Sequence, residues 1–590
     1  MKTKLILSIL LLGALLKSNA QNVLPVMKLR PADYEYLSSP DSLGIRHQIL
    51  MPNIMNKTTN AIPKLPYPII FIHGLDSGAH VWGNLGDTND MTDVLTSYGL
   101  SFGGRFDFNL NDDNNNLTSN KIIYPDPGSD IAQYSTTIVN GDFYFLNFAV
   151  GSDGSYNPSN LSSLNVLSNE ASIAKQGVAL SRAIQQVMNT TGRDKVILFG
   201  HSMGGLCARE YLQNPENWTE PSIKHHVAKL ITTGTPHGGY TGANFLITGI
   251  NSSSEAYRDL RTEYSNNNSG AFLFGGIESS NYIGTSYYNN DINCNGINND
   301  NSTILGLNQK NLYTDVDYAY IMGNCTNCVI SQGTILGDGV VRLVNANLSN
   351  FYNLPSPKNE FIYTASAITE IHSDLPKAIA VNMQALDEPN QLWLAYGVEY
   401  DLTYKGFIYN QPENGYLNDY DDYKFTVTDN SIVNIIINNI TSSTLSARIF
   451  DINGTLIGNT YSGNLSNPIN ISQLLSTGDY YLEIYGTPID ISVIKSYNFN
   501  LSSTLTSNSF ELEEFLVHPN PTTSKVYFDN SNSNFKEVSI YNYLGQEVAK
   551  TSFTTSIQNQ EIDMSTLAIG VYVLKFSDDA KSKSVKVIKQ

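Results

Sequence analysis

The sequence predicts an α/β domain, with a mostly parallel sheet flanked by helices, followed by two C-terminal β-sandwich domains. In the first part of the chain, short apolar runs alternate with longer amphipathic runs, which is typical of strands joined by covering helices. After about residue 387 the helical spacing ends, and short alternating segments separated by Asn and Gly follow. We place the three domains at residues 21–386, 387–508 and 509–590.

The length and the charge of the chain narrow its function classes. A chain of 590 residues exceeds what one hydrophobic core supports. The formal net charge of -19 repels phosphate backbones, so nucleic acid is not an expected partner. Anionic membrane surfaces are unfavourable for the same reason, and neutral substrates fit best.

Residues 1–20 are expected to be a signal peptide. A basic start precedes the apolar run Leu5–Leu16, and Ser18-Asn19-Ala20 supplies small residues for cleavage before Gln21. The apolar run is too short to be a strong membrane-spanning candidate. We therefore expect a secreted protein.

Apolar spacing predicts the elements of the first two domains. Near-helical intervals between residues 169 and 190 predict a helix, and Gly192 is placed to end it. Apolar runs predict strands in the α/β domain at Ile69–Ile72, which is expected to be buried, and at Val196–Phe199, Leu230–Thr233, Ala319–Met322 and Phe361–Thr364. Alternating runs predict sandwich strands at Tyr423–Thr428, Ile432–Ile437, Ala447–Asp451 and Asp479–Tyr485.

The candidate nucleophile is Ser202. Residues 200–205 read Gly-His-Ser-Met-Gly-Gly, match the pattern GxSxG and lie between a predicted strand and a helix that begins near Met203. So tight a strand-to-helix turn accepts only small residues around the serine, and it lifts the hydroxyl clear of the sheet. This context favours a catalytic serine over a chance match.

The expected base is His372, because this fold places the triad in the order serine, acid, histidine. His372 follows the predicted strand Phe361–Thr364 by a short loop. Four other histidines after the serine suit the role less well. His225 and His226 lead into a strand, His237 leaves little room for a preceding acid, and His518 lies in the last domain.

Asp338 is the preferred acid. It lies in a Gly-Asp-Gly turn after the run Ala319–Met322, where a loop-borne carboxylate can orient an imidazole. Asp315 and Asp317 remain competitors, and an ordinary Asp-Gly turn is the alternative interpretation.

Two backbone amides should receive the oxyanion of the transition state. Met203 supplies one, because it follows the nucleophile. Leu75 is expected to supply the other, since His73-Gly74-Leu75 directly follows the first predicted strand and Gly74 permits a close backbone approach. A plain glycine turn is the alternative.

The four cysteines predict little cross-linking. Cys207 is expected to be a buried small side chain on the helix after the nucleophile. Cys294, Cys325 and Cys328 form an odd set, from which one local disulfide is expected with its pairing left open. A zinc site is the weaker interpretation, because one CxxC does not make a ligand set.

Together these motifs resemble the bacterial lipases and related esterases of the α/β-hydrolase superfamily, over roughly residues 60–385. The matching segments are His73–Leu75, Gly200–Gly205, Thr233–Gly239, Gly337–Val341 and His372–Pro376. The resemblance implies an α/β-hydrolase fold, the triad Ser202, Asp338 and His372, and carboxylic esters, including those of lipids, as substrates. It also implies a structural role for His237. The loop from Thr241 to Asn311 follows no pattern of the family, so any lid and the acyl-chain preference stay open.

That loop holds a candidate calcium site. Asp291, Asn293, Asn295 and Asp300 lie in a segment whose D-x-N-x-N-G spacing resembles the start of an EF-hand or dockerin loop. Ser302 stands where the bidentate Glu is expected, so an Asn-rich turn is the alternative. We expect no organic cofactor, with calcium as a candidate structural ion.

The two C-terminal domains carry their own resemblances. Residues 387–508 resemble a prepeptidase C-terminal domain in pattern. Residues 509–590 resemble the C-terminal sorting domain of the type IX secretion system, through His518–Thr522, Val538–Gln546, Leu567–Tyr572 and a basic end. This resemblance implies the outer-membrane secretion machinery as a partner, with release or attachment at the cell surface.

The sequence thus predicts a secreted serine ester hydrolase, a lipase or carboxylesterase, that acts through a covalent acyl-enzyme. Within the enzyme class an acyltransferase, a polyester depolymerase or a peptidase could use the same residues. A non-catalytic cell-surface adhesin is the alternative of another class.

Overall fold

The computed structural model describes most of the chain. The described residues are 34–40, 46–52, 64–83, 89–110, 131–134, 138–158, 168–218, 224–240, 254–260, 273, 276–277, 304–328, 336–354, 359–409, 418–442, 444–486, 495–505, 515–531, 535–553, 559–578 and 582–590. The predicted signal peptide lies outside them. Within this part of the chain, no helix has both the length and the apolar character needed to cross a membrane.

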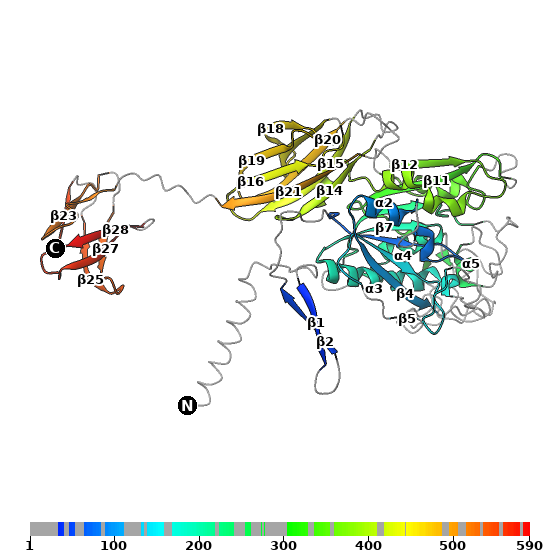
Figure 1. Ribbon diagram of the computed structural model, residues 1–590, viewed down its shortest axis with the longest axis horizontal. Coiled ribbons are helices and arrows are strands. Elements are labelled where there is room, and N and C mark those ends of the chain that lie inside the picture. The colour runs from blue at the N-terminus through cyan, green and yellow to red at the C-terminus, as the bar shows by residue number, and fades with distance from the viewer. Residues whose placement is uncertain are drawn as a thin grey trace. The chain divides into compact units, whose positions relative to one another are not determined.

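The chain divides into two compact units, residues 1–504 and 505–590. The first unit contains an α/β layer structure and a β-sandwich, and the second is a separate small β-sandwich (Figure 1). The predicted fold class is confirmed.

An eight-stranded sheet forms the centre of the α/β part. Its order is β12-β11-β8-β7-β3-β6-β4-β5, and neighbouring strands are parallel except for the edge pair β4 and β5. The strands are β3 (Ile69–Ile72), β4 (Phe102–Leu110), β5 (Ile131–Tyr134), β6 (Phe143–Asn147), β7 (Val196–His201), β8 (Val227–Thr233), β11 (Asp317–Cys325) and β12 (Asn359–Ala365). The five predicted strands of this domain are all present. The other three, β4, β5 and β6, come from segments for which the sequence analysis predicts no strand.

Helices cover both faces of this sheet. The helices are α2 (Met91–Ser97), α3 (Ile173–Thr191), α4 (Met203–Gln213) and α8 (Ile379–Ala385). On one face, Leu198 and Leu230 pack with α3 and α4 in a buried core; on the other, Phe71 and Phe199 pack with residues of α2 and α8. The central strands β3, β7 and β8 are buried along their whole length because both faces of the sheet are covered.

The predicted helix is confirmed as α3. The Ser172 side chain accepts a hydrogen bond from the amide of Lys175 at its start, and Gly192 ends it with φ 72°. That left-handed conformation is the one that glycine adopts most readily.

The β-sandwich follows α8 and belongs to the same unit. One sheet has the order β13-β15-β20-β17-β18 and the other β14-β21-β16-β19. Its strands are β13 (Tyr396–Gly397), β14 (Thr403–Ile408), β15 (Asp419–Val427), β16 (Ser431–Asn438), β17 (Leu445–Asp451), β18 (Leu456–Gly463), β19 (Ile469–Leu475), β20 (Gly478–Gly486) and β21 (Lys495–Leu505). Side chains along β16 alternate between buried and more exposed, as the predicted alternation requires.

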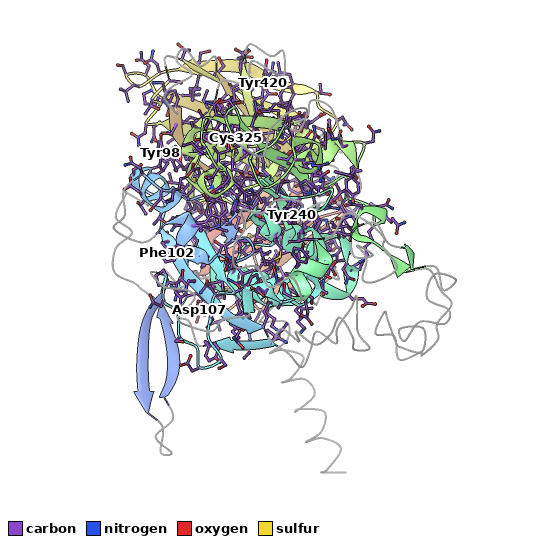
Figure 2. All side chains as sticks on the ribbon, turned by 90° about the vertical axis from the view of Figure 1, so that its right-hand side faces the viewer. Tyr98, Phe102, Asp107, Tyr240, Cys325 and Tyr420 are labelled. Carbon is purple, nitrogen blue, oxygen red and sulfur yellow. A yellow bond between two sulfur atoms is a disulfide. The ribbon has the colours of Figure 1, made fainter. Side chains whose placement is uncertain are left out.

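The sandwich packs against the α/β part through a continuous apolar core. Tyr67 and Tyr396 meet edge to face with ring centroids 5.3 Å apart. The guanidinium of Arg193 donates to the hydroxyl of Tyr404 at 3.2 Å, and Tyr404 is fully buried. Tyr98 near the end of α2 and Tyr420 on the sandwich are labelled in Figure 2.

The second unit consists of a three-stranded sheet, β22-β23-β26, and a four-stranded sheet, β25-β24-β27-β28. Its strands are β22 (Val517–His518), β23 (Lys525–Phe528), β24 (Glu537–Tyr541), β25 (Glu547–Ser552), β26 (Gln560–Asp563), β27 (Gly570–Ser577) and β28 (Ser582–Lys589). Buried residues of both sheets, including Val526, Phe528 and Phe576, form one core.

The remaining elements lie outside these layers. They are β1 (Tyr34–Pro40), β2 (Arg46–Pro52), β9 (Gly276–Ile277), β10 (Ile304–Leu305), α5 (Glu255–Asp259), α7 (Leu343–Ala346), and the 3-10 helices Ala79–Trp82, Ser168–Glu170, Pro215–Asn217, Leu307–Gln309, Leu348–Asn350, His372–Lys377 and Leu392–Leu394.

Candidate active site

Ser202 occupies the turn between β7 and α4. Its backbone has φ 53° and ψ -127°, outside the regions that residues with side chains favour. Such strain persists only where the surroundings fix it, and it is the conformation expected of a nucleophile elbow. The Ser202 amide donates to the carbonyl of Thr233 at 2.9 Å, which ties the turn to β8.

Close packing explains the glycines of the motif. A Cβ added to Gly200 would lie 2.4 Å from the amide nitrogen of Gly205. A Cβ added to Gly204 would lie 2.5 Å from the carbonyl oxygen of His73. Larger residues at these two positions would therefore push the elbow away from its neighbours.

His372 and Asp338 form a hydrogen-bonded pair. Nδ1 of His372 lies 2.7 Å from Oδ2 of Asp338, and Asp338 is fully buried. The other carboxylate oxygen, Oδ1, accepts from the amides of Val340 at 2.8 Å and Val341 at 2.6 Å. Three bonds thus fix this carboxylate, and the tight Asp-Gly turn supplies two of them.

The pair also sets the tautomer of the imidazole. A carboxylate only accepts, so Nδ1 of His372 carries the hydrogen and Nε2 is left with a lone pair. Burial alone would lower the pKa of His372, but the charges of Asp338 and Glu370 and the bond to Asp338 outweigh it and raise that pKa above its ordinary value.

Contacts that His201 and Gly234 make with His372 place it close to Ser202. The ring of His201, the residue before the serine, lies 4.8 Å from the ring of His372, and its Nε2 donates to the His372 carbonyl at 3.0 Å. A Cβ added to Gly234, which follows the residue bonded to Ser202, would lie 3.1 Å from Nδ1 of His372. The structure brings the three predicted triad residues into one region.

The predicted oxyanion residues lie beside the serine. A Cβ on Gly74 would approach the Ser202 Cβ to 2.6 Å and its Oγ to 3.2 Å, so the loop after β3 passes directly over the nucleophile. Met203 is the first residue of α4, and it shares an apolar cluster with Leu75.

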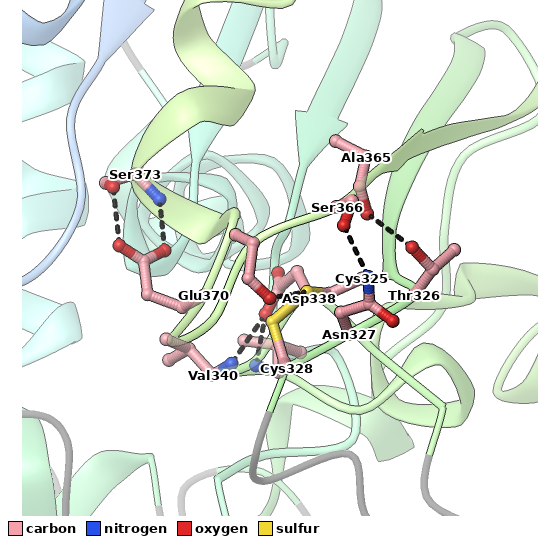
Figure 3. Close-up of a disulfide and its surroundings, with 12 residues drawn as sticks. Cys325, Thr326, Asn327, Cys328, Asp338, Val340, Ala365, Ser366, Glu370 and Ser373 are labelled. Atoms are coloured by element: carbon pink, nitrogen blue, oxygen red, sulfur yellow. Dashed lines mark hydrogen bonds between the residues drawn. A yellow bond between two sulfur atoms is a disulfide. The ribbon is translucent and has the colours of Figure 1, made fainter.

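A disulfide lies beside the acid. Cys325 at the end of β11 is bonded to Cys328, and both pack against Ile371, the residue before His372. The Cys325 amide donates to the carbonyl of Gly337, next to Asp338, at 2.7 Å. Figure 3 shows this disulfide with Asp338 next to it. The pairing left open by the sequence is thus Cys325–Cys328, while Cys207 is free and buried.

The competing candidates have other partners. Asp315 lies 3.2 Å from Nε2 of His225, and Asp317 forms a buried ion pair with Lys229 at 2.7 Å. His237 is fully buried, where it lies 3.2 Å from the guanidinium of Arg209, in agreement with a structural role. The predicted calcium residues Asp291, Asn293, Asn295 and Asp300 lie outside the described residues.

A different group of carboxylates could hold a metal ion. Oxygens of Asp387, Glu388 and Asp421 lie within 4.8 Å of one another, and all three residues are buried. Lys229 of β8 donates to the Asp387 carbonyl at 2.6 Å, so the group lies where the α/β part meets the sandwich. No sequence motif marks these acids, because Glu388 and Asp421 are 33 positions apart and the fold brings them together.

We expect this group to make stability depend on pH. Burial and neighbouring carboxylates raise the pKa of Glu388 to about 8. One of these neighbours is Asp419 at the start of β15, and burial raises its pKa to about 7. The folded state therefore binds more protons than the unfolded state between pH ~4 and these values, so stability falls as pH rises through that window. With EDTA present to remove metal ions, the unfolding temperature should drop as the pH is raised from 5 to 8. Asp421→Asn should make this drop smaller. Calcium ions held among the carboxylates would offset the repulsion, so CaCl₂ should raise the unfolding temperature more at pH 8. A flat profile in EDTA would contradict this account.

Comparison with protein-family models gives two matches. Residues 66–271 match the PGAP1-like alpha/beta domain, and residues 516–590 match the secretion system C-terminal sorting domain. The chain carries a PGAP1-like α/β-hydrolase domain. The sorting domain that follows indicates secretion through the type IX system, with attachment to the cell surface or release. The family match of the hydrolase domain covers Ser202 and ends before Asp338 and His372.

Solved structures similar to this chain share little sequence with it. A Bacillus licheniformis lipase, BlEst2, in its propeptide form is 14% identical over 89% of this chain and 94% of its own, with a TM-score of 0.27. A gene product of Listeria innocua is 14% identical over 55% of this chain and 95% of its own, with a TM-score of 0.31. The prepeptidase C-terminal domain of a Bacillus anthracis collagenase is 18% identical over 20% of this chain and 99% of its own, with a TM-score of 0.16. A comparison with curated proteins finds no match.

Proposed function

We propose that the hydrolase domain cleaves carboxylic esters, including those of lipids, through a covalent acyl-enzyme on Ser202. The observation that carries the proposal is a strained serine elbow next to a buried Asp-His pair. The family match supports a hydrolase of this fold. That its substrates are carboxylic esters is part of the proposal.

The chemistry follows from these groups. Ser202 Oγ attacks the ester carbonyl while Nε2 of His372 takes its proton, which requires a hydrogen bond between those two atoms in the substrate complex. Asp338 holds the imidazole and stabilises the imidazolium. The amides of Leu75 and Met203 receive the negative oxygen. His372 then returns the proton to the leaving alcohol, and water releases the acid by the same steps. No organic cofactor is required by this scheme.

The test is hydrolysis of p-nitrophenyl esters from acetate to palmitate by the mature protein. Turnover would support the proposal, and the preferred chain length would separate an esterase from a lipase. Folded protein that hydrolyses no ester in the series would contradict the proposed function. Acyl transfer, polyester cleavage or adhesion would then be favoured.

The pH dependence of turnover should reflect the raised pKa of His372. The base must be neutral, so kcat/KM should fall as pH drops through an apparent pKa above 6.5, the ordinary value for histidine. Glu370 adds negative charge near the ring, so Glu370→Gln should move the acid limb to lower pH. An acid limb below 6.5 in the unmodified protein would count against His372 as the base paired with Asp338.

A further inference from the structure

The residue before the nucleophile, His201, takes no part in the chemistry described above, yet it contacts the base directly. It is the last residue of β7, and only 5% of its surface is exposed. Its ring lies 4.8 Å from the ring of His372, and its Nε2 lies 3.0 Å from the His372 carbonyl oxygen. The GxSxG pattern accepts any residue at this position, so the pattern gives His201 no role.

The bonding partner determines the tautomer of His201. A carbonyl oxygen can only accept, so Nε2 carries the hydrogen and donates it. Nδ1 is buried, and among the described residues it has no hydrogen-bond partner. The indole of Trp82 lies edge to face with this ring, with centroids 6.4 Å apart. The bond to His372 is therefore the one hydrogen bond that the His201 side chain makes within the described part of the chain.

His201 is neutral at physiological pH. Burial, followed by the charge of His372, lowers the pKa of His201 well below its ordinary value. The neutral form matters because His372 becomes an imidazolium during the reaction, and a second positive charge 4.8 Å away would oppose that step. A neutral donor can hold His372 without opposing its protonation.

The bond connects the backbone of the base to the strand that carries the nucleophile. Asp338 holds the His372 imidazole through Nδ1, and its carbonyl accepts from the amide of the preceding residue, Ile371, at 2.8 Å. Both of these contacts fix His372 to the acid. The bond from His201 instead fixes His372 to the nucleophile, because the backbone of His201 continues directly into Ser202.

Resting on the proposed function, we propose that His201 is a positioning residue that sets the distance between the serine nucleophile and the imidazole of His372. Without the bond, His372 stays paired with Asp338 but loses its connection to the elbow. A misplacement of about 1 Å between reacting groups can cost on the order of a hundredfold in rate. This role differs from that of Asp338, which sets the tautomer of the imidazole.

The test compares two substitutions of His201. His201→Leu removes the donor and keeps an apolar side chain in the buried site. In His201→Gln the side-chain amide nitrogen can reach the position of Nε2 and still donate to the His372 carbonyl. Because proton transfer depends on placement to within about 1 Å, we expect His201→Leu to lower kcat by on the order of a hundredfold. KM should change little, and His201→Gln should recover most of the loss.

A second readout separates positioning from a general loss of structure. The proton between His372 and Asp338 gives a low-field proton NMR signal, which should persist in His201→Leu because Asp338 still holds the ring. His225→Leu is the matched control, because His225 is similarly buried, at 6% exposed, and its Nδ1 has a backbone partner, the amide of Val227 at 3.1 Å. His225 precedes β8, at the end of the sheet away from the elbow, so kcat should stay unchanged.

The outcomes distinguish this inference from the proposed function. Unmodified protein that hydrolyses no ester would overturn both. Active unmodified protein with wild-type kcat in folded His201→Leu would overturn the positioning role alone. Equal losses in His201→Leu and His201→Gln, or loss of the low-field signal in His201→Leu, would also overturn it, since His201 would then maintain the fold of the site instead of the distance.

Discussion

Ser202→Ala is expected to lower kcat for ester hydrolysis by about a millionfold, the size of loss seen when a serine nucleophile is removed from a triad that acts as a unit. The substitution removes only Oγ. The backbone bond from the Ser202 amide to Thr233 remains, so the elbow should keep its shape. Turnover of a p-nitrophenyl ester by purified protein measures the loss.

The control for this variant is Ser446→Ala. Ser446 lies on the sandwich, where its hydroxyl shares a hydrogen bond with Ser462, and it should have no effect on turnover. Near-UV circular dichroism of both variants checks folding. Residual activity of Ser202→Ala within tenfold of the unmodified protein would show that another group attacks the ester.

Asp338→Asn should lower kcat by on the order of 10⁴-fold, the effect of the same change in a well-studied serine protease triad. The asparagine oxygen can still accept from the amides of Val340 and Val341. Its NH₂ group then faces Nδ1 of His372, which must become an acceptor, so the imidazole hydrogen moves to Nε2. An imidazole in that tautomer cannot take the proton of Ser202.

The matched control is Asp315→Asn, which changes the competitor that pairs with His225 instead of His372. It should leave kcat within about twofold, because surface ion pairs contribute little. A large loss in Asp315→Asn together with a small loss in Asp338→Asn would show that Asp315, and not Asp338, is the acid of the triad.

Local sequence patterns predicted the central strands of the α/β sheet well. The strand before Ser202, β7, and its neighbour β8 are buried along their whole length, and both sequences contain runs of apolar residues. By contrast, β4 contains Gly103, Gly104 and Arg105 and lies toward the sheet edge, so its pattern is weak. Phe102 and Asp107 of this strand are labelled in Figure 2.

Contacts between distant segments could not be predicted from spacing. The sequence left three acids open, and only the fold shows that Asp338 faces His372 while Asp315 faces His225. The buried carboxylates at the sandwich depend on the same kind of long-range placement.

The most direct test of the central claim is the site at which a fluorophosphonate reacts with the folded, secreted protein. A phosphorus–oxygen bond forms to the nucleophile and fluoride leaves, so intact mass and peptide mapping locate the adduct. We predict one adduct per chain, on Ser202, with turnover lost in proportion to labelling. An adduct on another residue that tracks the loss of turnover, or no adduct in protein that hydrolyses esters, would contradict a Ser202 nucleophile.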